Sequence, residues 1–523
     1  MNVSSSRLIV LKNAVANVVR GSAAALVALI VPPFLVRALP YEVFSVWSLV
    51  LQLSMYTAFL DFGIQTAVAR FVAYTTESGD VIHRNRIVST SFALLTGAAI
   101  SGILLVVVLS WQLPHLFSEL PVDLINEARI ALLVVGGGAA LGLPASVYIG
   151  VFVGLQRSEV PAIILAGSRL LSAFLLVLVA NSWPSILLLA VVTSAINIIS
   201  YVLQYWACRK IVLDLHVAWR LLSTDTAKEI VGYCFSLSIW SFATLLITGI
   251  DLALVGVFDF SAVAYYAIAT SLITFILGLQ NALFGTLIPV SAAANVRNDH
   301  SVLSTMLISS TRYSVFILLL TGLPLITAAD GILTIWVGSK YAVNATILLQ
   351  VLVVANIIRL SALPYTMLLI GTAQQRLVTV TPLIEGCLNL IISVIAGSFL
   401  GAIGVALGTL VGSVIGVACH LFINMPRTKG INIDRKQYAM QGLVRPLICS
   451  SPFLCILFAD MFFLSLTAFY QIVLVGMSTM VTLGLFWRWG LQMDEQHTIS
   501  RFVLSPVFVI LHKWQKLNQQ QSN

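Results

Sequence analysis

The sequence has very little charge for its length. Asp, Glu, Lys and Arg make up 9% of its 523 residues, whereas soluble domains contain roughly 25%. Hydrophobic residues make up 59%, and the mean hydropathy is +1.00. Too few charges remain to cover a water-exposed surface, so an ordinary soluble domain is excluded. The chain is predicted to be an all-α, polytopic membrane protein.

The motifs of enzymes and ATPases are missing as well. The six cysteines have no CxxC spacing and no histidine at zinc-ligand distance, so we interpret them as packing residues and expect no metal or other cofactor. No GxxxxGK[ST] sequence occurs, which argues against transport driven by an ATPase domain of the chain itself. No nucleophile elbow or catalytic carboxylate pair is recognisable either. A transporter is therefore favoured over an enzyme.

The N-terminal segment lacks the pattern of a cleavable signal. No small-residue cleavage site follows Met1–Lys12, and the apolar stretch continues to Leu39, so we expect it to be the first membrane helix. About 20 apolar residues cross the hydrocarbon layer. The spans between charged segments predict fourteen helices, at about 13–36, 43–73, 87–110, 127–154, 158–180, 184–207, 229–257, 262–293, 302–328, 342–371, 377–399, 402–425, 441–461 and 464–487.

The basic residues alternate from loop to loop. Every second loop carries arginine or lysine, as at Arg84, Arg157 and Arg376, whereas the loops between them, such as 181–183, hold almost none. The positive-inside rule places the basic side, and both termini, in the cytoplasm. This explains the net charge of +8 through topology and not through nucleic-acid binding.

The two halves of the chain resemble each other. Leu143-Pro144 with Gly154-Leu155-Gln156-Arg157 is similar to Leu363-Pro364 with Gly371 to Arg376, about 220 residues later. This spacing predicts a parallel repeat of two six-helix lobes around a central cleft. The predicted parts are an N-terminal lobe (1–208), a cytoplasmic inter-lobe loop (209–228), a C-terminal lobe (229–425), two additional helices (426–487) and a cytoplasmic tail (488–523).

A run in the second predicted helix carries two opposite charges. It reads Phe59-Leu60-Asp61-Phe62-Gly63-Ile64, followed by Ala69-Arg70-Phe71. On a straight helix, Asp61 and Arg70 face opposite ways and lie roughly 13 Å apart in depth. Arg70 is expected to pair locally with Glu77. A charge at membrane depth is costly unless it faces a bundle interior or a watery cavity, so this helix is predicted to line one.

This run resembles the second-helix signature of the oligosaccharide flippases. The run Glu385-Gly386-Cys387-Leu388-Asn389-Leu390 with Gly401 to Thr409 adds to the resemblance. The family meant is the polysaccharide transporters, including Wzx-type flippases, of the multidrug/oligosaccharidyl-lipid/polysaccharide (MOP) exporter superfamily. The resemblance covers about residues 7–425 and implies a MATE-like fold. It also implies movement of undecaprenyl-diphosphate-linked glycans, such as O-antigen, exopolysaccharide or capsule units, to the outer leaflet by alternating access.

Further charges lie within the predicted spans. Arginine matches phosphate oxygens with a forked set of donors, so the excess of cations favours an anionic ligand. We expect the substrate-binding residues to be Arg20, Arg169, Arg312 and Arg359. For Arg20 and Arg312, snorkelling to the membrane surface is an equal alternative. The acidic residues could neutralise an arginine, bind a proton or bind Na⁺, and they are Asp61, Asp251 and Glu385.

The resulting prediction is a flippase in the bacterial inner membrane with a lipid-linked anionic oligosaccharide as substrate. A lipid II flippase and a cation-coupled multidrug exporter of the same superfamily stay open as alternatives, and the exporter predicts an acidic cavity. A glycan polymerase or ligase is disfavoured because no large outer loop is present. We expect membrane lipids but no nucleic acid as partners. We also expect a monomer, with association with glycan-polymerising machinery left open.

Overall fold

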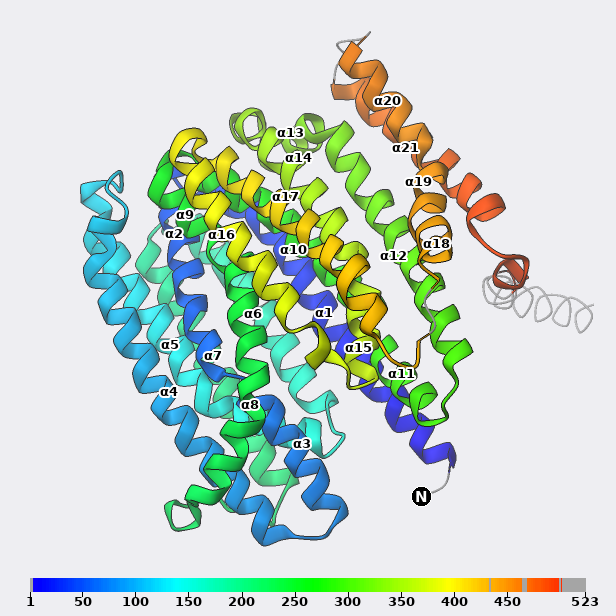
Figure 1. The fold of residues 1–523 in the computed structure, drawn as a ribbon. Helices are drawn as coiled ribbons and strands as arrows, with labels where there is room; N and C mark the ends of the chain where they lie inside the picture. The colour runs from blue at the N-terminus through cyan, green and yellow to red at the C-terminus, as the bar shows by residue number, and fades with distance from the viewer. Residues whose placement is uncertain (1–2, 432–433, 463–467, 498–499, 501–523) are drawn as a thin grey trace, which may run out of the picture.

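The computed structural model describes residues 3–431, 434–462, 468–497 and 500, with side chains described outside 3–20, 236, 457–462 and 468–470. Every regular element in these residues is helical, which confirms the all-α class. Most of the long helices run side by side as one tall bundle (Figure 1). The first half of the chain supplies α1 (Val3–Ala38), α2 (Tyr41–Met55), the 3-10 helix η1 (Tyr56–Asp61), α3 (Ile64–Glu77), α4 (Val81–Leu116), α5 (Val122–Gly154), α6 (Glu159–Ser182) and α7 (Ile186–Ile211).

The second half begins after the short 3-10 helix η2 (Trp219–Leu221). It comprises α8 (Thr224–Thr244), the π-helix η3 (Leu245–Gly249), α9 (Asp251–Phe258), η4 (Phe260–Ala262), α10 (Val263–Phe284), α11 (Leu287–Val296), α12 (His300–Thr327), α13 (Ala329–Val337), α14 (Ser339–Ser361), α15 (Leu363–Gly371), η5 (Gln375–Val378), α16 (Val380–Leu400), α17 (Ala402–Cys419), η6 (His420–Asn424) and η7 (Met425–Arg427).

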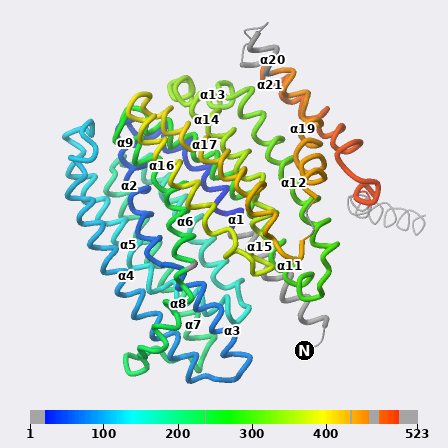
Figure 2. The backbone as a smooth tube through the Cα atoms, in the orientation of Figure 1, coloured from blue at the N-terminus to red at the C-terminus, as the bar shows by residue number. Residues whose placement is uncertain are grey.

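The last described elements pack at the edge of the bundle, beside α12 (Figure 2). They are α18 (Arg435–Gln437), η8 (Tyr438–Val444), α19 (Arg445–Cys449), α20 (Ser451–Phe462), α21 (Ala468–Leu485) and η9 (Phe486–Gly490). They therefore lie beside the second half of the chain.

The predicted number of fourteen membrane helices is not confirmed. Among the described residues, 12 helices are long and apolar enough to cross a membrane. A thirteenth span results if Thr224–Phe235 and Leu237–Gly249, which are bent by 48°, are taken together. The span predicted at 441–461 is divided into short helical pieces. Part of the last predicted span, 464–467, lies outside the described residues, as does most of the predicted tail.

The second span is broken beside Asp61. Phe62 and Gly63 adopt left-handed backbone conformations, with φ of 49° and 80°. A Cβ on Gly63 would lie 2.6 Å from the Cβ of Leu237, so only glycine fits this turn. The straight-helix assumption behind the opposite facing of Asp61 and Arg70 is therefore wrong.

Equivalent turns recur in the two halves. Gly79 and Asn298, about 220 residues apart, both have left-handed φ angles, of 71° and 55°. Each is followed by an aspartate that caps the next helix: Asp80 accepts from the His83 N–H at 2.8 Å, and Asp299 from the Val302 N–H at 3.2 Å. Gln156 and Ala373 form a second matching pair of turns, with φ of 59° and 57°. Matching backbone geometry at matching positions supports a two-lobe architecture built from one duplicated unit.

The apolar core is made of several clusters, and they differ between the two ends of the bundle. We call the end that carries Arg84, Arg157 and Arg376 the basic end, and the opposite end the cation-poor end. At the cation-poor end, one core cluster contains residues of both lobes, such as Trp47 and Tyr266. Toward the basic end, one cluster combines the N-terminal lobe with Ile230 and Cys234 of α8, and another belongs to the C-terminal lobe alone. The lobes thus share one core at the cation-poor end, whereas toward the basic end only α8 of the second half packs into the core of the N-terminal lobe.

Candidate functional site

A pocket of about 710 Å³ lies between the lobes at the basic end. One wall is α3, the second is the part of α8 around its bend, and the third is the turn from α15 into η5. Its lining residues are Thr66, Arg70, Tyr233, Leu237, Trp240, Ile370, Ala373, Gln375, Arg376 and Thr379. No described lining residue is acidic, whereas two are arginines, so the pocket favours an anionic ligand.

Arg70 is held in this wall by an aromatic contact. Thr66 and Arg70 are exposed and spaced by four within α3, which places them on one face of that helix. The Arg70 guanidinium carbon lies 4.5 Å from the centre of the Tyr233 ring, a cation–π geometry. The expected local ion pair with Glu77 is wrong, because none of the ion pairs found among the described residues includes Arg70. Its donors therefore stay available to a ligand.

Arg376 and Gln375 enter the pocket from the C-terminal lobe. Arg376 is exposed in η5, and the buried Gln375 Oε1 has no hydrogen-bond partner among the described atoms. An unpaired buried amide oxygen is costly, so a ligand hydroxyl would be a suitable donor for it. From the sequence, Arg376 was predicted only to lie in a basic loop. Its place in the duplicated turn was visible in the sequence, but the direction in which that turn faces was not.

The four arginines predicted to bind substrate are not brought together in one cleft. Arg312 is 1% exposed on α12, where it forms an ion pair with Glu495 from the C-terminal segment. That partner lies beyond the two lobes, so the expectation that Arg312 projects into the cleft is wrong. Arg169 is exposed midway along α6. The side chain of Arg20 lies outside the described residues.

Arg359 belongs to the interior of the C-terminal lobe. Its guanidinium donates a hydrogen bond to the Asn356 side chain, one turn earlier on α14. It is also close enough to Asp251 and Glu385 to interact electrostatically with both. Arg359 is therefore positioned to balance buried carboxylates, and it does not line the inter-lobe pocket.

Asp251 is the centre of a buried polar cluster in that lobe. Its carboxylate accepts hydrogen bonds from the Asn389 amide at 3.2 Å and from the Thr409 hydroxyl at 3.0 Å. The Ser393 hydroxyl lies 3.2 Å from both the Asn389 Oδ1 and the Val405 carbonyl oxygen. Five oxygen-bearing groups from α9, α16 and α17 thus lie close together beside the π-helix η3, and the Asn389 NH2 lies between Asp251 and the others.

Glycines on α17 make this cluster compact. A Cβ on Gly412 would lie 3.1 Å from the Asn389 Cβ, and a Cβ on Gly416 would collide with the Glu385 carboxylate. Small residues at this spacing let two membrane helices approach closely. Glu385 is 6% exposed, and its Oε1 has no hydrogen-bond partner among the described atoms. This carboxylate is enclosed within the lobe and does not face the pocket.

Asp61 has a local role in the N-terminal lobe. Its carboxylate accepts a hydrogen bond from the Ser146 hydroxyl at 3.3 Å and lies against the backbone N–H groups of Gly63 and Gln65. A carboxylate at the start of α3 satisfies N–H groups that the helix itself leaves free. Asp61 therefore stabilises the broken turn that directs Arg70 into the pocket wall.

At the cation-poor end, direct contacts close the gap between the lobes. The Tyr41 hydroxyl of α2 donates to the Ser261 carbonyl, and its ring packs against Tyr265 at 5.4 Å and Tyr341 at 6.0 Å. The Phe260 N–H donates to the Glu119 carboxylate at 3.2 Å. The arrangement is that of a multi-pass membrane protein with two lobes, a pocket between them toward one end and closed contacts at the other.

Comparisons with known proteins agree with this class. A family model described as polysaccharide biosynthesis protein matches residues 10–295, which is more than half of the chain. The chain therefore belongs to the polysaccharide biosynthesis protein family. No curated protein sequence matches it.

Solved structures show the same fold at low sequence identity. A structure described as lipid II flippase MurJ, inward closed conformation, has a TM-score of 0.65 and 14% identity, and the match covers 92% of this chain and 98% of that one. A multidrug resistance MATE family transporter of the MOP superfamily, in an inward-facing conformation, has a TM-score of 0.56 and 15% identity over 80% and 94% of the two chains. A MOP superfamily transporter from Pyrococcus furiosus, described as having a binding pocket of reverse polarity, has a TM-score of 0.56 and 14% identity over 80% and 95%.

Proposed function

We propose that this protein is a flippase for a lipid-linked anionic oligosaccharide in the bacterial inner membrane. The substrate class is an undecaprenyl-diphosphate-linked repeat unit of O-antigen, exopolysaccharide or capsule. The observation that carries the proposal is the presence of Arg70 and Arg376, one from each lobe, in the wall of a pocket of about 710 Å³ between those lobes. Family membership and the MurJ-like fold support the same class of substrate.

The chemistry of the pocket suits a diphosphate joined to a sugar. A diphosphate that leaves the headgroup layer needs replacement solvation, and guanidinium groups provide it through paired, permanently charged donors. Tyr233 and Trp240 offer apolar ring faces against which sugar rings can pack, and the Gln375 Oε1 can accept a sugar hydroxyl. The pocket therefore has separate features for the charged and the uncharged parts of the ligand.

Closure of the bundle at one end supports transport by alternating access. The basic end is assigned to the cytoplasm by the positive-inside rule, and both termini with it. In this orientation the pocket lies toward the side on which lipid-linked sugars are made, while the contacts of Tyr41 close the outer side. Opening those contacts and closing the basic end would release the glycan outward.

The alternatives make different demands on the same pocket. A multidrug exporter for cations needs acidic groups in the cavity, but Asp61, Asp251 and Glu385 are not among the pocket-lining residues. A lipid II flippase has the same phosphate chemistry, so the glycan portion must discriminate between the two. Arg169 and Arg20 stay candidates for contact with substrate at other stages of the cycle. Membrane lipids as surroundings, a monomeric state and association with polymerising machinery stay expectations.

We further propose that the Asp251 cluster binds the coupling cation, either Na⁺ or a proton. Two adjoining groups of oxygen atoms are available: the Asp251 carboxylate with the Thr409 hydroxyl, and the Ser393 hydroxyl with the Asn389 amide oxygen and the Val405 carbonyl. The Asn389 side chain joins the two groups, because its NH2 donates to Asp251. Hard cations prefer oxygen ligands, and transporters use carbonyls beside irregular helix segments for this purpose. This cluster would supply the ion coupling that a chain without an ATPase motif needs.

The decisive experiment measures surface glycan in cells whose own flippase gene is deleted. Arg70→Ala and Arg376→Ala should each reduce export by about tenfold or more, because a charged hydrogen bond contributes roughly 1.5–3 kcal/mol. Lysine at either position should restore export only in part, since it keeps the charge but loses the fork. The matched control is Arg297→Ala, an exposed arginine at the same end that does not line the pocket.

Membrane amounts of each variant must be measured in parallel. Full export by both alanine variants at normal protein amounts would disprove the role of these arginines. Rescue of cells depleted of their lipid II flippase, without any effect on surface glycan, would assign the substrate to lipid II instead.

A further inference from the structure

The inter-lobe loop is fastened onto the N-terminal lobe at the basic end. The Arg84 guanidinium lies 2.8 Å from the Asp214 carboxylate, and the Asn85 amide donates to the Asp214 carbonyl at 3.0 Å. Further along the loop, the Ala218 N–H donates to the Ser89 hydroxyl at 3.1 Å. All three anchors on the lobe belong to α4, so the loop crosses from the end of α7 to α4.

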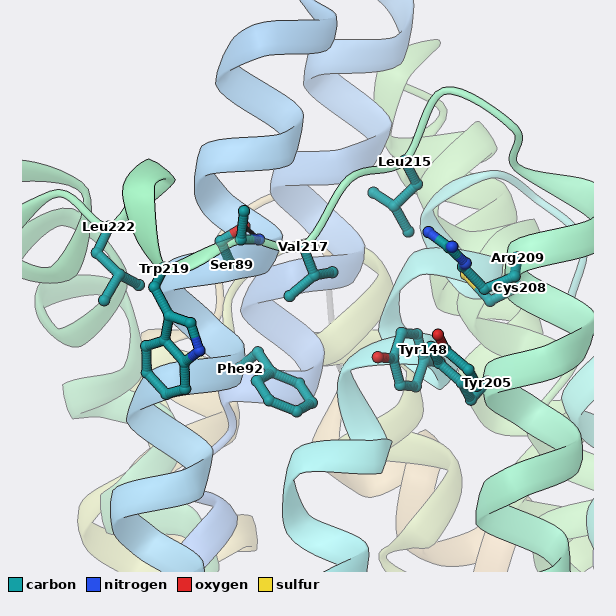
Figure 3. A pocket seen from close by; sticks show the side chains of 11 residues that line it. Ser89, Phe92, Tyr148, Tyr205, Cys208, Arg209, Leu215, Val217, Trp219 and Leu222 are labelled. Atoms are coloured by element: carbon teal, nitrogen blue, oxygen red, sulfur yellow. Dashed lines mark hydrogen bonds between the residues drawn. The ribbon is translucent and has the colours of Figure 1, made fainter.

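A pocket of about 240 Å³ lies beneath this loop (Figure 3). Phe92 of α4, Tyr148 of α5 and Tyr205 of α7 form its aromatic wall, and Trp219 and Arg209 lie at opposite sides of it. Tyr148 and Tyr205 meet edge to face at 5.5 Å, which stiffens the wall. This pocket shares no lining residue with the inter-lobe pocket, so it is a separate site.

The surface around this pocket is apolar in places where a water-soluble loop would be polar. Leu213 and Trp219 in the loop are 81% and 71% exposed, and Trp206 at the end of α7 is 69% exposed. Tryptophans at the ends of membrane spans sit at the headgroup level of the bilayer. On α7, Ile198 and Val202 are exposed and lead along one face to Tyr205. The pocket is therefore continuous with a surface that faces lipid.

We propose that this pocket binds an acidic glycerophospholipid of the cytoplasmic leaflet. The Arg209 guanidinium would bind the lipid phosphate, and the aromatic wall would hold the glycerol region and the first part of one acyl chain. The volume admits only such a part, because a cavity of about 150 Å³ already accommodates a benzene molecule. Basic pockets at the cytoplasmic ends of membrane helices bind acidic lipid headgroups in this way. The proposal uses the orientation proposed above and is independent of the glycan.

The bound lipid would hold the loop against the N-terminal lobe. Since this loop is the covalent link between the lobes, its fixation limits how they move relative to each other. Lipid composition would thereby influence the transport cycle from a site remote from the transported glycan.

The test uses the purified full-length protein in detergent. Phosphatidylglycerol, phosphatidylcholine and inorganic phosphate are each added, and the midpoint of thermal unfolding is measured. Phosphatidylglycerol should raise the midpoint of the wild type by several degrees, and the other two should have little effect. Arg209→Gln removes the charge, and Ala218→Phe fills the pocket from an extended backbone (φ −146°, ψ 144°) that accepts a large side chain. Both variants should lose most of the shift.

Lys210→Gln is the matched control, because Lys210 is the exposed neighbour of Arg209 and does not line the pocket. It should keep the shift caused by phosphatidylglycerol. Equal loss in Lys210→Gln and Arg209→Gln would indicate general surface attraction and overturn the proposal, as would equal effects of phosphatidylcholine or free phosphate on the wild type. If a variant does not fold, a photoreactive phosphatidylglycerol is crosslinked to the wild-type protein instead. The crosslinks should map to residues that line this pocket. Crosslinks confined to other segments would overturn the site.

Discussion

The Arg37 guanidinium of α1 donates a hydrogen bond to the Trp336 carbonyl of α13 at 3.2 Å, across the boundary between the lobes. It also reaches the Ile335 carbonyl at 3.3 Å. In the opposite direction, the Trp336 indole N–H donates to the Leu29 carbonyl of α1 at 3.0 Å. The lobes are thus held at the cation-poor end by reciprocal hydrogen bonds, which must break whenever that end opens.

Arg37→Ala is expected to shift the protein toward opening at this end. Two hydrogen bonds at an exposed position contribute roughly 1 kcal/mol, which corresponds to an about fivefold change in the ratio of open to closed molecules. Spin labels are placed at the exposed positions Val122 and Val343, one on each lobe. In Arg37→Ala, a larger fraction of molecules should show a long distance between the two labels. Arg129→Ala is the control, because Arg129 donates to the Ser110 carbonyl at 3.2 Å within one lobe. An unchanged distance distribution in Arg37→Ala would show that these hydrogen bonds do not hold the cation-poor end closed.

Glu495→Gln is expected to destabilise the protein but to spare transport. The variant leaves the charge of Arg312, which is 1% exposed, without its partner. Breaking a buried pair from one side costs on the order of 3 kcal/mol, so the thermal midpoint should fall by several degrees. The double variant Arg312→Leu with Glu495→Leu should recover most of that loss. Loss of glycan export in a well-folded double variant would indicate that Arg312 does contact the substrate.

The loop anchor at Asp214 should respond to acid. The hydrogen bond from Arg84 is the main cause that lowers the pKa of the Asp214 carboxyl below its ordinary value. A lowered folded-state pKa means that the anchor stabilises the loop fully above about pH 4 and that this stabilisation is lost as the pH falls toward the folded pKa. A spin label at Leu213 should therefore become more mobile in strong acid. In Asp214→Asn, the label should be equally mobile at neutral pH. Its mobility should then no longer increase in acid, because residue 214 has no proton to take up.

The Asp251 cluster should distinguish among cations if it binds one. Na⁺ is expected to raise the thermal midpoint of the wild type more than K⁺ at equal ionic strength, since binding to the folded state stabilises it. Asp251→Asn should abolish the difference. Asp123→Asn, which changes an acidic residue in the first turn of α5, is the control for charge alone. Identical responses to both ions, together with pH-independent transport, would exclude Na⁺ and proton coupling at this site.

Much of the architecture could be predicted because it depends on local composition. Apolar spans between charged loops identify most of the membrane helices, and the basic loops indicate one orientation for all of them. The duplicated turn after α5 and α15 was likewise visible in the residues themselves. The segment 441–461 was expected to be one continuous helix but is divided into shorter ones. Hydropathy does not show where a helix is interrupted.

The functional site could be predicted only in part. The second span was singled out because Asp61 and Arg70 lie in an apolar run, and Arg70 does line the inter-lobe pocket. Its expected partner, Glu77, was inferred from spacing on a regular helix, which cannot reveal the Tyr233 ring that approaches from α8. A contact between residues so far apart in the chain depends on how the helices pack.

The sequence alone determined that the chain is helical and polytopic, because these properties follow from composition and from the lengths of the apolar spans. The matching segments about 220 residues apart predicted the two related halves. Only the tertiary structure decided that Arg376 lines the pocket and that Arg312 forms an ion pair with Glu495. It also decided that Asp251 accepts hydrogen bonds from Asn389 and Thr409. Hydropathy records whether a residue lies in a span but not which way it faces. That direction depends on the left-handed turn at Gly63 and on neighbours that the chain brings together from distant positions.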